Sequence, residues 1–148
     1  MYQILRKEKL AENIYLMDIH APRVAKSAHP GQFVIVRATK EGERIPLTIS
    51  DYDTERGSVQ IVVQTLGVST LKLCEIAEGD YIEDFAGPLG RPSDFVYENI
   101  EELKGKRLLF IAGGVGTAPV YPQVKWLHEH GVEADVIIGA KTKDILIL

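Results

Sequence analysis

The chain has 148 residues, of which 45% are hydrophobic and 26% charged, a balance typical of a folded globular protein. The formal net charge of -4 argues against a nucleic-acid binder, which would usually carry a basic face. No apolar run approaches the roughly 20 residues needed to cross a bilayer, and the charged N-terminus is unlike a signal peptide. A single cysteine, Cys74, excludes a disulfide framework or an iron–sulfur cluster built from this chain alone. We therefore expect a cytoplasmic protein with no nucleic-acid partner, no membrane partner and no metal site.

The first eighty or so residues are predicted to be all-β, because short segments rich in β-branched and aromatic residues recur between polar turn signals. Six strands are expected in "YQILRKEKL", "NIYLMDIHA", "FVIVRA", "IPLTIS", "SVQIVVQT" and "YIEDFAG". This pattern predicts a small antiparallel β-barrel or sandwich of six strands. Before the last strand, Val68, Leu71, Leu73 and Ile76 have loosely helical spacing, which predicts one short helix plugging the barrel.

The pattern changes after "GPLGRPSDF". "LLFIA" and "ADVIIGA" are apolar enough for strands buried on both faces. Between them, Val120, Val124 and Leu127 have the spacing of an amphipathic helix, which Gly131 is expected to end. The three elements predict a β-α-β unit with parallel strands and a right-handed crossover. We therefore expect a β-barrel domain over residues 1–95 and the first part of an α/β nucleotide-binding domain over residues 96–148.

The predicted α/β part is incomplete, because two parallel strands and one helix leave sheet edges and faces uncovered. The sequence also stops in the apolar segment "DILIL". We expect the chain to be a fragment of a longer protein, or a protein from which further residues have been removed.

The turn "AGGVGTAP" lies between the first of these strands and the helix. Its glycines permit a tight turn and a close approach of ligand to backbone, and the following helix N-terminus attracts anions. Gly114 and Gly116 match the start of the dinucleotide pattern G-x-G-x-x-G, whereas Pro119 replaces its last glycine. A plain strand-to-helix turn is the alternative, but the flanking strand and helix favour a phosphate site. Lys141 and Lys143 follow the second strand, where they would either meet a 2′-phosphate or be ordinary surface residues.

The order of "RIPLTIS", "GVST", "GPLG" and "GGVGTAP" along the chain resembles the ferredoxin–NADP reductase family, in which an FAD-binding barrel precedes a pyridine-nucleotide domain. Within it, the chain is most similar to two flavin subunits. One is the electron-transfer subunit of dihydroorotate dehydrogenase, and the other belongs to NADH-dependent ferredoxin:NADP oxidoreductase, also called sulfide dehydrogenase. The resemblance covers all 148 residues, but only the first half of such a subunit.

The resemblance implies a set of cofactor-binding residues. They are Arg44, Pro46, Leu47, Thr48, Gly67, Ser69, Thr70, Gly113, Gly114, Gly116 and Thr117. The arginine would neutralise the FAD pyrophosphate, and residues 46–48 would lie along the isoalloxazine and ribityl chain, with Thr48 hydrogen-bonding the flavin. Residues 67–70 would bind the pyrophosphate through backbone N–H groups and hydroxyls, and residues 113–117 would bind the NAD(P) pyrophosphate. Leu47 takes the place of the family's usual tyrosine, and the arginine stands four residues before Thr48 where the family has three.

The function implied by the resemblance is electron transfer. NAD(P)H would give a hydride to FAD, and single electrons would pass to a [2Fe–2S] centre, expected only in the missing C-terminal part, and then to a catalytic partner subunit. Ferredoxin is a further possible partner, and no side chain is expected to act as acid or base. An alternative is the subunit that serves dihydroorotate oxidation, and an alternative of another class is a cofactor-free β-barrel binding module. We expect the chain by itself to be incomplete and inactive as an enzyme.

Overall fold

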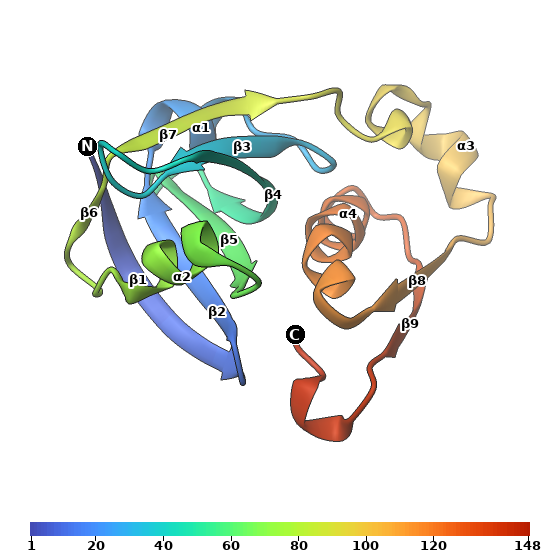
Figure 1. Ribbon diagram of the computed structural model, residues 1–148. Coiled ribbons are helices and arrows are strands. Elements are labelled where there is room, and N and C mark those ends of the chain that lie inside the picture. Colours follow the sequence, from blue (N-terminus) through green and yellow to red (C-terminus); the bar gives the residue numbers. More distant parts are fainter.

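The computed structural model describes residues 1–148, and its larger sheet is a curled antiparallel sheet of seven strands (Figure 1). The strands are β1 (Tyr2–Ala11), β2 (Ile14–His20), β3 (Phe33–Arg37), β4 (Arg44–Asp53), β5 (Ser58–Gln64), β6 (Tyr81–Ile82) and β7 (Asp84–Leu89). Their order across the sheet is β6-β1-β2-β5-β4-β3-β7. Because the edge strands β6 and β7 are separated in sequence only by Glu83, the sheet has to curl until its two edges approach each other. The predicted antiparallel barrel is confirmed in the form of a half-barrel.

The sixth predicted strand, "YIEDFAG", is divided in the structure. Its first residues form β6, which pairs with β1, whereas β7 pairs with β3 on the opposite edge of the sheet. The change of partner occurs at Glu83, whose backbone N–H donates to the carbonyl of Ala38 at 3.3 Å. The sheet therefore has seven strands where the sequence predicted six.

The core of the half-barrel is built by the inward-facing side chains of its strands. Met17 lies opposite Ile61, and Ile19 opposite Val59, in the antiparallel pairing of β2 with β5. All four of these side chains are completely buried. They belong to a cluster of 17 buried residues, to which the successive strands and the two helices α1 (Pro22–Ser27) and α2 (Val68–Glu75) contribute. Burial of this apolar surface is the main source of stability of the fold.

The short helix predicted before the last strand is confirmed as α2 (Val68–Glu75). Leu73 and Cys74 are buried in the barrel core, and burial raises the pKa of the Cys74 thiol to about 11. The predicted apolar face is wrong at its first two positions, because Val68 is 68% exposed and Leu71 is 49% exposed. Only the last turn of α2 enters the core, and its first turn projects from the barrel.

Two helices lie in segments for which the sequence predicted none. Helix α1 (Pro22–Ser27) follows β2, has a proline in its first turn and buries Val24 and Ala25 in the core. Helix α3 (Ile100–Lys104) lies in the predicted polar connection, where the side chain of Asn99 accepts hydrogen bonds from two backbone N–H groups of the first turn. A 3-10 turn, η1 (Asp94–Tyr97), precedes α3.

The C-terminal part contains the predicted β-α-β unit. It consists of β8 (Leu109–Gly113), the 3-10 turn η2 (Gly114–Gly116), α4 (Thr117–Glu129), β9 (Asp135–Gly139) and the 3-10 turn η3 (Lys143–Ile145). The parallel pairing of β8 with β9 is confirmed. Although both strands are apolar, Ile111 of β8 is 73% exposed and every residue of β9 is exposed, as expected if two strands and one helix leave sheet faces uncovered. Phe110 of β8 packs against a buried cluster that contains Leu103 of α3 and Leu127 of α4.

Helix α4 packs against the barrel and ends as predicted. Ala118 is buried in an apolar cluster with Leu16 and Val62 of the barrel. At the other end, Gly131 has a φ of +77°, and the N–H of Val132 donates to the carbonyl of Leu127 at 2.8 Å.

No helix of the structure combines the length and the apolar character needed to cross a membrane. The domain division between residues 95 and 96 stays a prediction.

Candidate functional site

Strand β4 carries the first group of predicted cofactor residues. Side chains alternate between its two faces, so that Arg44, Pro46 and Thr48 share one face. Leu47 points the other way, because it packs partly against the barrel core and lies opposite Val34 of β3. Arg44 and Pro46 are exposed and Thr48 is half-buried. Arg44, Pro46 and Thr48 are therefore accessible to a ligand on one face of the strand. Leu47 is less accessible, because part of its side chain packs against the core.

Two arginines share one carboxylate at the start of β4. Asp84 Oδ2 lies 2.6 Å from Nη2 of Arg37 and 3.0 Å from Nη2 of Arg44. The Arg44 side chain is 54% exposed, whereas that of Arg37 is 23% exposed and its buried Nε has no hydrogen-bond partner. Two guanidinium groups against one carboxylate leave a local excess of positive charge. Arg37 and Asp84 were not among the sequence-predicted residues, since their contact depends on the pairing of β3 with β7.

The first turn of α2 carries the second group. Gly67 precedes the helix, and a methyl group added to it would meet no atom within 4 Å. The Thr70 hydroxyl accepts hydrogen bonds from the N–H groups of Leu66 and Gly67, at 2.9 and 3.1 Å, and donates to the Gly67 carbonyl at 3.0 Å. Thr70 therefore shapes the turn. The backbone N–H groups that follow have no carbonyl partner within the helix, as in the first turn of any α-helix, and are free to bind an anion.

One hydrogen bond links the first turn of α2 to the loop that precedes β4. The Ser69 hydroxyl donates to Oε2 of Glu43 at 2.8 Å, and Glu43 directly precedes Arg44. The loop between β3 and β4 and the first turn of α2 enclose a cavity of about 520 Å³. Glu41, Glu43, Gly67 and Ser69 are among the residues that line it. The sequence predicted both groups, but not the acidic loop that joins them.

The glycine turn forms as predicted, between β8 and α4. Gly114 has a φ of +57°, a conformation that favours glycine, and a methyl group added to Gly113 or Gly116 would meet no atom within 4 Å. The backbone is thus open to a close approach by a ligand. Thr117 is only 3% exposed and its hydroxyl has no hydrogen-bond partner. No hydrogen bond or ion pair of the structure links this turn to the residues on β4 and α2.

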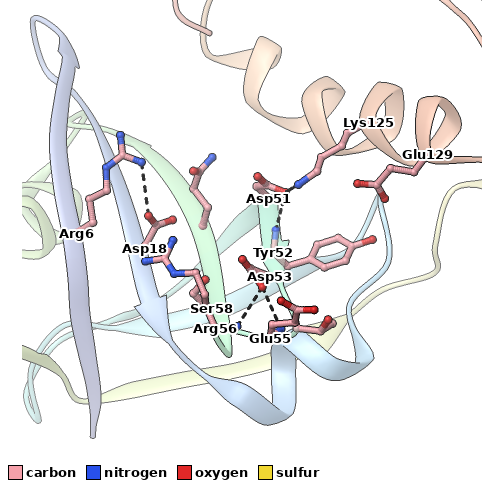
Figure 2. Close-up of a pocket in the computed structure, with 12 residues that line it drawn as sticks. Arg6, Asp18, Asp51, Tyr52, Asp53, Glu55, Arg56, Ser58, Lys125 and Glu129 are labelled. Atoms are coloured by element: carbon pink, nitrogen blue, oxygen red, sulfur yellow. Dashed lines mark hydrogen bonds and ion pairs between the residues drawn. The ribbon is translucent and has the colours of Figure 1, made fainter.

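A second, polar cavity of about 420 Å³ lies between the barrel and α4, and sequence reasoning did not find it (Figure 2). Nζ of Lys125 on α4 donates to Oδ1 of Asp51 on β4 at 2.7 Å, and this is the only ion pair between α4 and the barrel. Burial alone would lower the pKa of Lys125, but the hydrogen bond and charge of Asp51 outweigh it and raise the pKa. Although the lining is rich in carboxylates, no group of three or more Asp, Glu, His or Cys residues is arranged to hold a metal ion. The cavity lies at the junction where the Lys125–Asp51 ion pair joins α4 to β4.

Asp18 on the wall of this cavity is expected to destabilise the protein at neutral pH. Burial raises the pKa of its carboxyl, and Asp51 adds to the effect, while Arg6 at 3.7 Å and Arg56 lower it only in part. An acid whose folded pKa exceeds its unfolded pKa binds more protons when folded, so its ionisation costs stability as pH rises. Asp18→Asn should therefore raise the thermal midpoint by a few degrees at pH 7.

The control for this prediction is Asp94→Asn, because the Asp94 side chain is 84% exposed. Thermal unfolding of both variants should be followed between pH 3 and pH 8. The advantage of Asp18→Asn should vanish at the acidic end, where Asp18 is protonated in both states. An unchanged or lower midpoint at pH 7 would show that the Arg6 contact outweighs the cost of burial.

Comparison with curated proteins finds close relatives, although no protein-family model matches the chain. The chain is 61% identical over 147 residues to a Clostridium beijerinckii protein named "Uncharacterized protein in adh 3'region", covering 99% of this chain and 50% of that protein. It is 44% identical over 147 residues to a Thermotoga maritima homologue of the electron transfer subunit of dihydroorotate dehydrogenase B (NAD(+)), covering 99% of this chain and 49% of that protein. The chain thus spans about half the length of these curated relatives.

Comparison with solved structures gives the same result. The structure of an NADH-dependent reduced ferredoxin–NADP oxidoreductase, determined in work on flavin-based electron bifurcation, matches with a TM-score of 0.88 and 42% identity, covering 100% of this chain and 51% of that chain. A ferredoxin–NADP+ reductase from Plasmodium falciparum shares the fold, with a TM-score of 0.76 at 16% identity, over 99% of this chain and 61% of that chain. These matches confirm the predicted resemblance and fold class. The individual cofactor residues stay predictions.

Proposed function

We propose that this chain is the flavin-carrying N-terminal half of an electron-transfer subunit, in a two-subunit oxidoreductase that takes its electrons from NAD(P)H. The observation that carries the proposal is the cavity between the first turn of α2 and the loop that leads into β4, which Ser69 and Glu43 join by a hydrogen bond. Similarity along the whole chain to a ferredoxin–NADP oxidoreductase and to a dihydroorotate dehydrogenase subunit homologue supports it.

The residues of this cavity, together with those of the adjoining strand β4, fit FAD. Arg44 offers an exposed guanidinium to a pyrophosphate, and the N–H groups of the first turn of α2 offer donors and the positive end of the helix dipole. Pro46 and Thr48, on the same face of β4 as Arg44, offer an apolar surface and a hydroxyl to the flavin ring and ribityl chain. When bound, FAD would supply an acceptor for the hydride of NAD(P)H and a donor of single electrons. The chain's own task is to bind and orient it.

The glycine turn is proposed to hold the pyrophosphate of NAD(P)H. Gly113, Gly114 and Gly116 leave the backbone open to a close approach, and the N-terminus of α4 follows directly. Thr117, with its enclosed hydroxyl, would act through its backbone N–H group. A [2Fe–2S] centre outside this chain, a catalytic partner subunit and a cytoplasmic location complete the proposal, and ferredoxin is a possible partner. The proposal includes a division into domains over residues 1–95 and 96–148.

Two partner reactions are consistent with the comparisons. A ferredoxin-linked role is supported by the 42% identity with the ferredoxin–NADP oxidoreductase, and dihydroorotate oxidation, in which dihydroorotate gives up electrons, by the 44% identity with the dihydroorotate dehydrogenase subunit homologue. The residues of this chain do not separate the two, because the partner's substrate would bind to the partner subunit. The alternative of another class is a barrel that binds no flavin.

Flavin binding is the first property to measure, by absorption titration of the purified chain with FAD and then with FMN. Arg44→Ala is expected to weaken FAD binding about tenfold or more, because it removes a charge-assisted contact to the pyrophosphate. Lys26→Ala, a charge change at the end of α1, is the control and should leave FAD binding unchanged.

The same titration separates the rival functions. Saturable FAD binding that is unaffected by Arg44→Ala would remove the assigned role of Arg44, and no binding of either flavin would favour a bare barrel module. We further propose that the flavin-loaded chain does not oxidise NADPH at enzyme-like rates. The glycine turn adjoins a two-stranded sheet in which every residue of β9 is exposed, so the nucleotide site around the turn is incomplete in this chain. Rapid bleaching of the flavin band on addition of NADPH would contradict this.

A further inference from the structure

The loop between β3 and β4 places a carboxylate where the proposed function requires a phosphate. Ser69 is assigned to the pyrophosphate, yet its hydroxyl donates to Glu43 Oε2 at 2.8 Å. A serine hydroxyl has one proton to donate, so it serves one acceptor at a time. Glu41 and Glu43 both line the same cavity, where Lys72 is the one positively charged residue, so the lining carries a net formal negative charge beside the first turn of α2.

The two ends of the loop are fixed to the sheet by contacts that do not involve α2. Arg37 ends β3 and Arg44 begins β4, and both are fixed to Asp84, at 2.6 and 3.0 Å. Between them, the loop is held by the bond from Gly42 N–H to the Thr39 carbonyl at 3.0 Å and by contacts with Arg37 and Glu83. The hydrogen bond from Ser69 to Glu43 is its single hydrogen bond to α2. Breaking that bond would release the loop from the helix while its base stays closed.

The exchange of Glu43 for a phosphate is also favourable for the helix. A carboxylate near a helix N-terminus interacts with the positive end of the helix dipole, and a phosphate does so at least as well. The helix therefore keeps an anion in either case. What differs is the repulsion between the two anions if both remain, which grows as the distance between them falls.

We propose that Glu43 sets the affinity of this site for phosphate-bearing flavins, by competing with the flavin phosphate for Ser69 and for the first turn of α2. The proposal rests on the proposed function, because it takes Ser69 and α2 to be the phosphate site. Glu43 opposes binding, and a phosphate-bearing flavin has to displace it. A flavin without phosphate does not meet it.

The test compares Glu43→Gln and Glu41→Gln, titrated with FAD and with riboflavin, which has no phosphate. Both variants remove one charge from the same loop, but only Glu43 is bonded to Ser69. Glu43→Gln is expected to bind FAD about tenfold more tightly than the unchanged chain, the size of a well-placed charge interaction, and to bind riboflavin equally. Glu41→Gln should change FAD affinity by less than about twofold. Glu43→Ala, which removes the acceptor as well, should match or exceed the gain of Glu43→Gln.

Each outcome decides the matter. Unchanged FAD affinity in Glu43→Gln overturns the proposal, and weaker FAD binding would instead make Glu43 a ligand of the flavin nucleotide. An equal gain for riboflavin would show that Glu43 acts on the ring and not on the phosphate. FAD binding by the unchanged chain tests the proposed function separately, and no FAD binding by any of the chains overturns both. Because the expected result is a gain of affinity, misfolding of a variant cannot imitate it.

Discussion

Leu73→Ala is expected to lower the free energy of unfolding by about 3 kcal/mol, the usual cost of emptying a leucine site in a packed core. Leu73 is completely buried in the cluster that the strands of the half-barrel form. Alanine would leave a cavity that the surrounding strands can close only in part, since they are held by their own hydrogen bonds. Because Leu73 also anchors α2, the variant should bind FAD more weakly. Urea unfolding and FAD titration on the same sample measure the two effects.

Leu71→Ala is the matched control for this prediction. It makes the same chemical change two residues earlier in α2, at a side chain that is 49% exposed. Its effect on unfolding should stay within about 0.5 kcal/mol, as for most surface substitutions. Equal losses of stability in the two variants would mean that α2 is not anchored through Leu73. Loss of stability in Leu73→Ala without loss of FAD affinity would detach α2 from the proposed flavin site.

The half-barrel could be predicted from sequence because each strand carries its own local signal. Alternating apolar residues such as Met17 and Ile19, followed by polar turns, indicate a strand before any partner is known. Helix α1 escaped notice because it has six residues and buries only Val24 and Ala25, too few for a helical period to show. The split at Glu83 escaped as well, because the change of partner strand depends on how the sheet curls.

In the C-terminal part the sequence predicts the strands but not what covers them. Residues such as Ile111 and Ile137 have the apolar character of strands covered on both sides, and the sequence does predict the parallel pair. Exposure, however, depends on what packs against the sheet. Ile111 and Ile137 remain 73% and 55% exposed, in agreement with the expectation that two strands and one helix leave sheet faces uncovered. An apolar pattern thus predicts the kind of element better than its surroundings.

The candidate site was predictable as two separate groups of residues, but the contacts around each group were not. Arg44 and Ser69 were found because each lies in a motif with a characteristic order along the chain. The bond from Ser69 to Glu43 spans 26 residues, and the Asp84 carboxylate reaches Arg44 only because β7 pairs with β3. No local spacing predicts such contacts. The sequence therefore predicts candidate binding residues, while the structure shows which side chains contact them.

Lys7→Met is expected to cost about 1.5 kcal/mol of stability, the lower end for hydrogen bonds from a charged group. Nζ of Lys7 on β1 donates to the carbonyl of Cys74 and, at 3.1 Å, to the carbonyl of Ile76, at the end of α2. These carbonyls have no partner within the helix and form the negative end of its dipole. Methionine keeps the apolar stem of the side chain but removes the donor. Thermal unfolding should show the loss, and Lys7→Arg should restore much of it.

The same change should weaken FAD binding several-fold, although Lys7 is on the far end of α2 from the proposed pyrophosphate site. Leu73 anchors the helix from within and Lys7 holds its C-terminal carbonyls, so both fix the direction in which Gly67 and Ser69 present their N–H groups. Lys9→Met is the control, since Lys9 pairs only with Glu12 at the surface, and it should change neither stability nor FAD affinity. Normal FAD affinity in Lys7→Met would show that the first turn of α2 keeps its place without this cap, and that Leu73 alone positions the site.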